Sequence, residues 1–357
     1  MTGGAGMKKF LMLIGVLCIL LTGCSWMDGE YHSVTPHAEE GTQQFQEGVT
    51  VSSYLELREA LYEIVNAGTT DAVFYVTQMN TEMVEQNMNA AIRHILTNTA
   101  IGSYSVREIT FEVGTQAEYC AVAVDVNYVH GRHEILRIKT APDMTLLKRR
   151  VDEALNNCSN AVVVRVARYE DLDLVQYVQD YVDRNASICM EMPQVSAVIY
   201  PESGEERIVE LTFTYETSRD TLRSMQESVE PIFDAAKLYV QGSENDQQKY
   251  SQLYSFLLER FDYQYETSIT PTYSLLRYGV GDCKAFASVY SNMCKKAGLF
   301  CSVISGTRNG EAWYWNQIKI DGVFYHVDLL ATDAAGDFAP RQSEQMSGYV
   351  WDYSVYP

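Results

Sequence analysis

One succession of helix and strand patterns occurs twice in this chain, with an offset of roughly 90 residues. In the first copy Ser53 opens a helix as part of a capping box, and the copy ends in the strict apolar alternation of Val122–Tyr128. The second copy ends in the same alternation at Val209–Tyr215. A unit of this length is a small domain rather than a solenoid repeat. The sequence therefore predicts two tandem αβαββ domains, at residues 50–140 and 141–240.

Within these copies the periodicity predicts individual elements. We expect strands at 72–76, 106–113, 161–166, 195–200 and 209–215, and a helix at 144–155. Another helix is expected at 218–240, where Pro231 should start a new turn or cause a kink. Neither copy gathers a convergent set of polar residues, so we expect spacers or binding modules rather than enzymes.

A different pattern begins at Gly281 in the last third of the chain. Asp282 is a good N-cap, Cys283 falls in the first turn of the predicted helix, and Gly298 ends it. The positive end of the helix dipole and the free backbone amides are expected to lower the pKa of the Cys283 thiol. Such a cysteine is a candidate nucleophile, and an inert buried cysteine is the alternative.

Several further features follow Cys283 at characteristic spacings. They are Ala297-Gly298-Leu299, the predicted strand 301–305, Gly306, Trp315-Asn316, Asp321-Gly322 and Tyr325-x-x-Asp328. Together they make residues 241–357 resemble the transglutaminase-like superfamily. The resemblance implies a domain related to papain-like cysteine proteases, with a helix packed on an antiparallel sheet. The fold class is thus α+β, with two tandem repeat domains followed by a transglutaminase-like domain.

The resemblance also implies residue roles. Cys283 takes the place of the nucleophile and Asp328 that of the acid that orients the histidine. The histidine position itself is occupied by Trp313, whose indole nitrogen only donates hydrogen bonds. His326 and, more weakly, Glu311 are the remaining candidates for a base. His326 is two residues from Asp328, roughly 7 Å along a strand, which disfavours a simple exchange of roles.

Two hypotheses of function stay open at this point. In the first, the transglutaminase-like domain is catalytically degenerate and serves as a binding or scaffolding module. Trp313, Trp315 and nearby tyrosines would then line a cleft for a protein, cell-wall peptide or glycan, or would simply be core residues. In the second, the domain is an active cysteine amidase, peptidase or transglutaminase that acts on protein or cell-wall peptide amides through Cys283.

The N-terminus carries a targeting pattern. Met7-Lys8-Lys9 precedes the apolar segment 10–21, which is short for a membrane span, and Leu21-Thr22-Gly23-Cys24 follows. This pattern resembles the lipobox of bacterial lipoproteins, which implies a signal peptide at 1–24 and a lipid on Cys24. A retained membrane anchor is the alternative. Residues 25–49, poor in aliphatic side chains, are expected to form a flexible tether, so the protein would be extracytoplasmic and lipid-anchored to the bacterial membrane.

Charge and cysteine usage exclude other classes of function. The formal net charge of -20 and the lack of Lys/Arg clusters argue against nucleic-acid binding. No C-x-x-C pair indicates a zinc site, no carboxylate loop indicates calcium, and no cofactor is expected. Six cysteines remain beyond Cys24, and most are expected to be small core residues.

Overall fold

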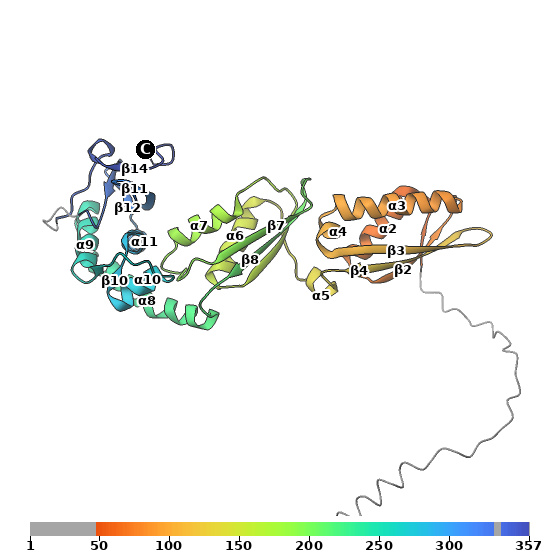
Figure 1. The fold of residues 1–357 in the computed structure, drawn as a ribbon, viewed down its shortest axis with the longest axis horizontal. Coiled ribbons are helices and arrows are strands. Elements are labelled where there is room, and N and C mark those ends of the chain that lie inside the picture. Colours follow the sequence, from red (N-terminus) through yellow and green to blue (C-terminus); the bar gives the residue numbers. More distant parts are fainter. Residues whose placement is uncertain (1–47, 332–336, 357) are drawn as a thin grey trace, which may run out of the picture. The chain divides into compact units, whose positions relative to one another are not determined.

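The computed structural model describes residues 48–331 and 337–356, and these form three four-stranded sheets and one two-stranded sheet (Figure 1). The predicted signal peptide, the lipid-bearing Cys24 and all but the end of the predicted tether lie outside the described residues. Across the described part of the chain, we find no helix with the length and apolarity that a bilayer crossing requires.

The first sheet has the strand order β1-β2-β4-β3. Its elements are β1 (Val49–Val51), α2 (Tyr54–Asn66), β2 (Asp71–Val76), α3 (Thr81–Asn98), α4 (Ala100–Ser105), β3 (Val106–Thr115) and β4 (Cys120–Tyr128). The Ser53 hydroxyl accepts from the backbone N–H of Glu56 and caps α2, as the capping box predicts. On β4 the side chains of Val122, Val124 and Val126 are buried, so the predicted alternation is confirmed.

The second sheet has the corresponding strand order, β5-β6-β8-β7. After the short α5 (Arg132–Ile135), its elements are β5 (Lys139–Ala141), α6 (Met144–Asn156), β6 (Ala161–Val166), α7 (Leu174–Arg184), β7 (Gln194–Tyr200) and β8 (Arg207–Thr214). In both sheets a three-residue strand, β1 or β5, pairs in parallel with the strand that follows the first helix. The sequence did not predict these strands. The division of residues 50–240 into two separate repeat domains stays a prediction.

The last part of the chain combines helices with a third sheet in the order β13-β12-β11-β14. Its elements are α8 (Arg219–Tyr239), α9 (Asp246–Leu258), β9 (Asp262–Tyr263), α10 (Pro271–Tyr273), the π-helical turn η1 (Ser274–Tyr278), β10 (Val280–Gly281), α11 (Cys283–Lys296), β11 (Cys301–Arg308), β12 (Glu311–Ile320), β13 (Val323–Val327), the 3-10 turn η2 (Ser343–Gln345) and β14 (Tyr349–Val350). The α8 helix continues through Pro231, so of the two predicted effects of this residue a new turn is wrong, and a kink stays a prediction. Parallel pairing joins β9 to β10 just before α11.

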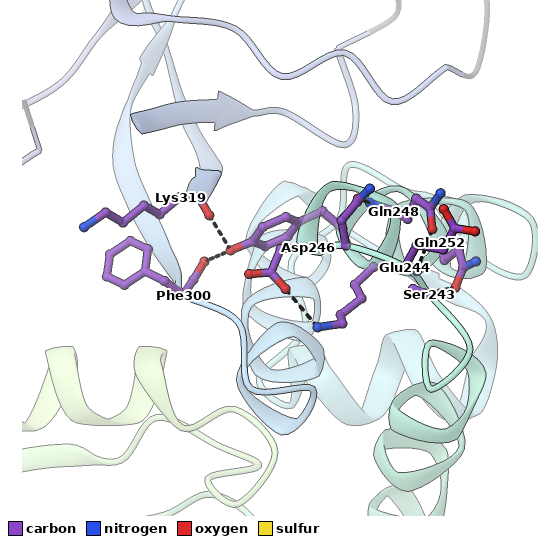
Figure 2. Close-up of polar contacts among 10 residues, drawn as sticks. Ser243, Glu244, Asp246, Gln248, Gln252, Phe300 and Lys319 are labelled. Atoms are coloured by element: carbon purple, nitrogen blue, oxygen red, sulfur yellow. Dashed lines mark hydrogen bonds and ion pairs between the residues drawn. The ribbon is translucent and has the colours of Figure 1, made fainter. Parts of the chain in front are cut away.

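Tyr250 ties α9 to the third sheet. Its ring is fully buried, and its hydroxyl donates to the carbonyl oxygens of Phe300, at 2.6 Å, and Lys319, at 3.3 Å (Figure 2). The same core extends into the preceding part of the chain, because the buried side chains of Met190 and Leu222 pack in it. The third sheet and α11 therefore share one core with residues upstream of the predicted boundary at 240.

Candidate functional site

Cys283 is the first residue of α11, as the sequence predicts. The Asp282 carboxylate accepts from the backbone N–H of Ala285 at 2.8 Å and caps the helix. The helix packs on the sheet, where the side-chain amide of Asn316 on β12 donates to the carbonyl oxygen of Ala287 at 2.8 Å. These contacts fix the thiol beside β12, half-buried at the helix N-terminus.

The expected lowering of the Cys283 pKa was wrong. Burial raises the pKa of this thiol above its ordinary value, and the negative charges of Asp282 and Asp328 raise it further. The backbone N–H groups of Tyr314 and Lys284 act in the opposite direction and are outweighed. The sequence pattern showed the helix N-terminus but could not show the two carboxylates or the burial around the sulfur. In this structure the favoured state of Cys283 at neutral pH is the thiol.

Trp313 and Asp328 are in direct contact. The indole Nε1 of Trp313, on β12, donates to Oδ2 of Asp328 at 2.9 Å. Asp328 follows the last residue of β13, the strand that pairs with β12. The register ends at Asn316 opposite Val327, and the Asp328 side chain reaches the indole of Trp313 further along β12. Its side chain is only 4% exposed. The structure thus brings together the acid and the indole at the positions that the resemblance assigned to them.

Three more groups surround the Asp328 carboxylate. The hydroxyl of Tyr349 on β14 donates to Oδ2 at 2.6 Å, and the backbone N–H of Leu330 donates to Oδ1 at 2.9 Å. Arg308 lies at 3.4 Å from Oδ2 as an ion pair. The sequence analysis did not identify Tyr349 or Arg308 as part of the site. The segment Tyr349-Val350-Trp351, made of aromatic and β-branched residues, is a weak indication of a further strand. The indole, the hydroxyl and the backbone N–H are hydrogen-bond donors, and the fourth group is a cation, so these four contacts all suit a carboxylate.

His326 lies in a buried polar contact of its own. It is 1% exposed, its Nδ1 lies 3.1 Å from the indole Nε1 of Trp315, and its Nε2 lies 3.1 Å from the hydroxyl of Ser343. Burial lowers the pKa of His326 to about 4. Both ring nitrogens are therefore engaged by residues other than Cys283 and Asp328. Glu311, the other candidate base, is exposed at the start of β12.

The aromatic residues near Cys283 divide between surface and core. Tyr263, 43% exposed, packs against Trp313 with ring centroids 6.1 Å apart, and Tyr265 and Tyr278 are also exposed. Trp315 is fully buried in a separate small core, so of the two alternatives for this residue, a binding cleft or the core, the structure shows the core. Five of the six cysteines beyond Cys24 are buried, as predicted: Cys120, Cys158, Cys189, Cys294 and Cys301.

The arrangement around Cys283 offers a thiol, a buried carboxylate and an indole that donates to that carboxylate. A cysteine hydrolase needs a group that accepts the thiol proton and later returns it to the leaving group. An indole N–H cannot accept a proton at neutral pH. Within residues 48–331 and 337–356 no three His, Cys, Asp or Glu side chains converge in the manner of a metal site.

One part of the chain matches the model of a known protein family. Residues 234–329 match the model of the transglutaminase-like superfamily. No curated protein matches the sequence.

Three solved structures are similar to parts of the chain. A structure described as a TGase has a TM-score of 0.29 and 9% sequence identity. The match covers 52% of this chain and 55% of the TGase. A candidate cysteine protease from Cytophaga hutchinsonii has a TM-score of 0.27 and 13% sequence identity. The match covers 44% of this chain and 70% of that protein. A candidate protease from Parabacteroides distasonis has a TM-score of 0.25 and 9% sequence identity. The match covers 72% of this chain and 39% of that protein. The chain thus spans about half the length of the TGase that it matches.

Proposed function

We propose, on the premise that residues 234–329 form a transglutaminase-like domain, that this domain is catalytically degenerate and acts as a binding or scaffolding module. The protein would carry it outside the cytoplasm on a bacterial membrane, attached through a lipid on Cys24. Its partners would be a protein, a cell-wall peptide or a glycan.

The observation that carries the proposal is the hydrogen bond from Trp313 to Asp328, at 2.9 Å. In a cysteine hydrolase of this type the acid holds an imidazole, and the imidazole moves a proton to and from the thiol. Here an indole N–H satisfies the acid instead. An indole keeps the orienting bond but cannot perform the proton transfer, so the contact supports a structural role for Asp328.

The state of the thiol supports the same proposal. Cys283 has a raised pKa, so only a small fraction is thiolate at neutral pH, and the thiol form is a weak nucleophile. The exposed rings of Tyr263 and Tyr265 precede it in the chain and offer amphipathic contact area for a partner.

An active cysteine amidase, peptidase or transglutaminase is the second candidate. It is favoured by the retention of Cys283 at the first position of α11, where the backbone N–H groups of Tyr314 and Lys284 lower the pKa of the thiol in part. This function requires a base such as Glu311 or His326 to reach the sulfur when a substrate binds.

Iodoacetamide labelling of Cys283 as a function of pH separates the two candidates. The labelled peptide is followed by mass spectrometry, and Cys283→Ala identifies the signal. A degenerate site predicts labelling that becomes fast only above about pH 8.5, the ordinary range of a free thiol. Fast labelling near pH 6 would contradict the proposal, because it requires a stabilised thiolate.

The variant Trp313→His sharpens this experiment. An imidazole at this position can pair with Cys283, so the midpoint of labelling is expected to move down by at least about one pH unit. Trp313→Gln is the matched control, since it also removes the indole but supplies no base. A wild-type protein that already labels at the same pH as Trp313→His would contradict the absence of a functional base.

The lipid anchor has a separate test. Radiolabelled palmitate should be incorporated into the full chain in a bacterial host, and Cys24→Ala should abolish both the label and recovery with the membrane fraction. Palmitate retained in Cys24→Ala would exclude attachment at this residue.

A further inference from the structure

Two buried cysteines meet between α11 and β11. Cys294 lies in the last turn of α11, and Cys301 is the first residue of β11. Their exposed fractions are 0% and 3%, and both belong to the core that α11 shares with the third sheet. Both are free thiols in the structure, and the thiol of Cys294 is in hydrogen-bonding contact with that of Cys301. This core therefore contains a pair of adjacent thiols rather than a lone cysteine.

Backbone contacts fix the position of each cysteine. The carbonyl oxygen of Cys294 accepts from the N–H groups of Ala297 at 3.0 Å and Leu299 at 2.9 Å, which ends the helix and turns the chain towards β11. The carbonyl oxygen of Cys301 accepts from the hydroxyl of Ser291 on α11 at 2.9 Å. Cysteines whose side chains point apart cannot be joined without moving the backbone. Here the two side chains already meet from backbone that is held in place.

The surroundings of the pair exclude water. Tyr290 on α11 is fully buried, and its hydroxyl contacts the thiol of Cys294 and donates to the carbonyl oxygen of Tyr250 at 3.0 Å. The hydroxyl of Tyr250 in turn donates to the carbonyl oxygen of Phe300, the residue before Cys301 (Figure 2). Burial raises the pKa of the Cys294 thiol well above its ordinary value. In the folded, reduced chain this sulfur is therefore a protonated thiol that reagents in solution do not reach.

We propose that Cys294 and Cys301 form a disulfide when the chain folds in the presence of a disulfide donor. The thiolate of one cysteine attacks the donor, whose own S–S bond breaks, so that a mixed disulfide forms and one thiol is released. The thiolate of the other cysteine then attacks the sulfur of the first, and the donor leaves as a second thiol. The two cysteines give up two protons and two electrons in total, and the donor takes up both. Because the closed core excludes the donor, this exchange takes place before α11 packs on β11.

The bond would link the end of α11 to the start of β11. It would hold the helix that begins with Cys283 against the sheet that carries Trp313, without involving either residue. By closing the segment 294–301 it also restricts the unfolded chain. Disulfide donors are supplied in oxidising compartments, so formation of the bond in cells rests on the proposed location outside the cytoplasm. Formation of the bond during refolding does not depend on that location.

Refolding with a defined disulfide donor tests the bond itself. The full chain is unfolded and reduced, refolded with oxidised and reduced glutathione, and its remaining free thiols are blocked with N-ethylmaleimide under denaturing conditions. Trypsin cuts after Lys295 and Lys296, so the two cysteines fall in separate peptides, 285–295 and 297–308. Mass spectrometry should find these peptides joined, and reduction should separate them. Recovery of both peptides blocked and unlinked would overturn the proposal.

Urea unfolding of oxidised and reduced protein gives an independent measurement. Reduction of the wild type is expected to lower the unfolding midpoint by about 0.5–1 M urea, because the closed loop is short and its entropic effect is modest. Cys301→Ala should show no shift between the two conditions. Cys120→Ala is the matched control, since it removes a thiol that is 4% exposed in a different core, and it should keep the wild-type shift. A shift that persists in Cys301→Ala would overturn the assignment to this pair.

Protein isolated from a bacterial host separates this inference from the proposed location. Free thiols are blocked with N-ethylmaleimide during lysis, and peptides 285–295 and 297–308 are mapped in the same way. Linked peptides would support both the bond and a location outside the cytoplasm. Peptides that are linked after refolding but blocked in protein from cells would support the bond and contradict the location.

Discussion

The indole Nε1 of Trp315 donates its hydrogen to Nδ1 of His326 across 3.1 Å. Because an indole nitrogen has no lone pair to offer, this contact fixes the tautomer of the imidazole. Nδ1 must be the acceptor, so Nε2 carries the proton and donates to the hydroxyl of Ser343 at 3.1 Å. Protonation of His326 would place two N–H donors face to face. The residue that the sequence offered as a base is thus held neutral in a structural contact.

This contact predicts a pH dependence of stability. The folded-state pKa of His326 is about 4, below its ordinary 6.5, so the unfolded state takes up the proton first as pH falls. The contribution is fully present above pH 6.5 and is lost as the pH falls towards 4. The loss amounts to at most about 3–4 kcal/mol in the free energy of unfolding, from the difference between pKa values of 6.5 and about 4 at about 1.4 kcal/mol per pKa unit.

Urea unfolding between pH 7 and pH 4.5 measures this dependence. His326→Gln should show a smaller fall of the unfolding free energy over this range than the wild type. His133→Gln, at an exposed position of α5, should keep the wild-type slope. A slope that is unchanged in His326→Gln would show that another group titrates.

A double-mutant cycle should measure the contact between Trp313 and Asp328. Hydrogen bonds to charged groups contribute about 1.5–3 kcal/mol, so the coupling of Trp313→Phe with Asp328→Ala should fall in this range. The measurement is the free energy of urea unfolding of the four proteins. Tyr177→Phe, whose hydroxyl donates to Asp152 on α6, shares no partner with Asp328 and should combine with Asp328→Ala additively within about 0.5 kcal/mol. Coupling near zero for the first pair would mean that the indole bond is not maintained in solution.

Local patterns in the sequence predict the elements well where the pattern is long. The alternation at 122–128 is visible over a whole strand, and Asp282 caps α11 through a bond to a residue three positions away. The three-residue strands β1 and β5 are too short to show a period.

The missed parts of the candidate site are contacts between distant segments. Tyr349 reaches Asp328 from a strand that joins the sheet at its far edge, and no local pattern connects the two residues. The raised pKa of Cys283 depends on burial by several segments together, which a motif cannot reveal. The position of Trp313 beside Asp328 could be expected, because the resemblance assigns these two residues to the positions of the histidine and of the acid that orients it.

Tyr250→Phe should destabilise the last part of the chain. The hydroxyl donates to the carbonyl oxygens of Phe300 and Lys319, and its removal leaves both without this donor (Figure 2). The expected cost is about 1–2 kcal/mol in the free energy of unfolding. Tyr254→Phe is the matched control on the same helix, because Tyr254 is 6% exposed and its hydroxyl has no hydrogen-bond partner among the described residues. Equal effects of the two substitutions, measured by urea unfolding, would contradict the anchoring role of Tyr250.

Gly306→Ala should be the most destabilising of the substitutions at strand glycines. A methyl group at this position of β11 would overlap the carbonyl oxygen of Val350 and would lie 2.7 Å from the ring of Trp315. Neither neighbour can move freely, because β14 pairs with β11 at this point and Trp315 is fully buried. Overpacking of this kind costs about 1–3 kcal/mol, and we expect the upper part of that range.

Gly114→Ala on β3 is the control for the change of residue type. The nearest atom to its new methyl group is the carbonyl oxygen of Ala121 at 3.8 Å, an ordinary contact, so stability should stay within about 0.5 kcal/mol of the wild type or rise slightly. Thermal and urea unfolding of both variants give the comparison. If Gly306→Ala were as stable as Gly114→Ala, β14 could not be packed against β11 as the structure has it. The donor that Tyr349 supplies to Asp328 would then be absent as well, since Tyr349 is held in place by its pairing with Arg308.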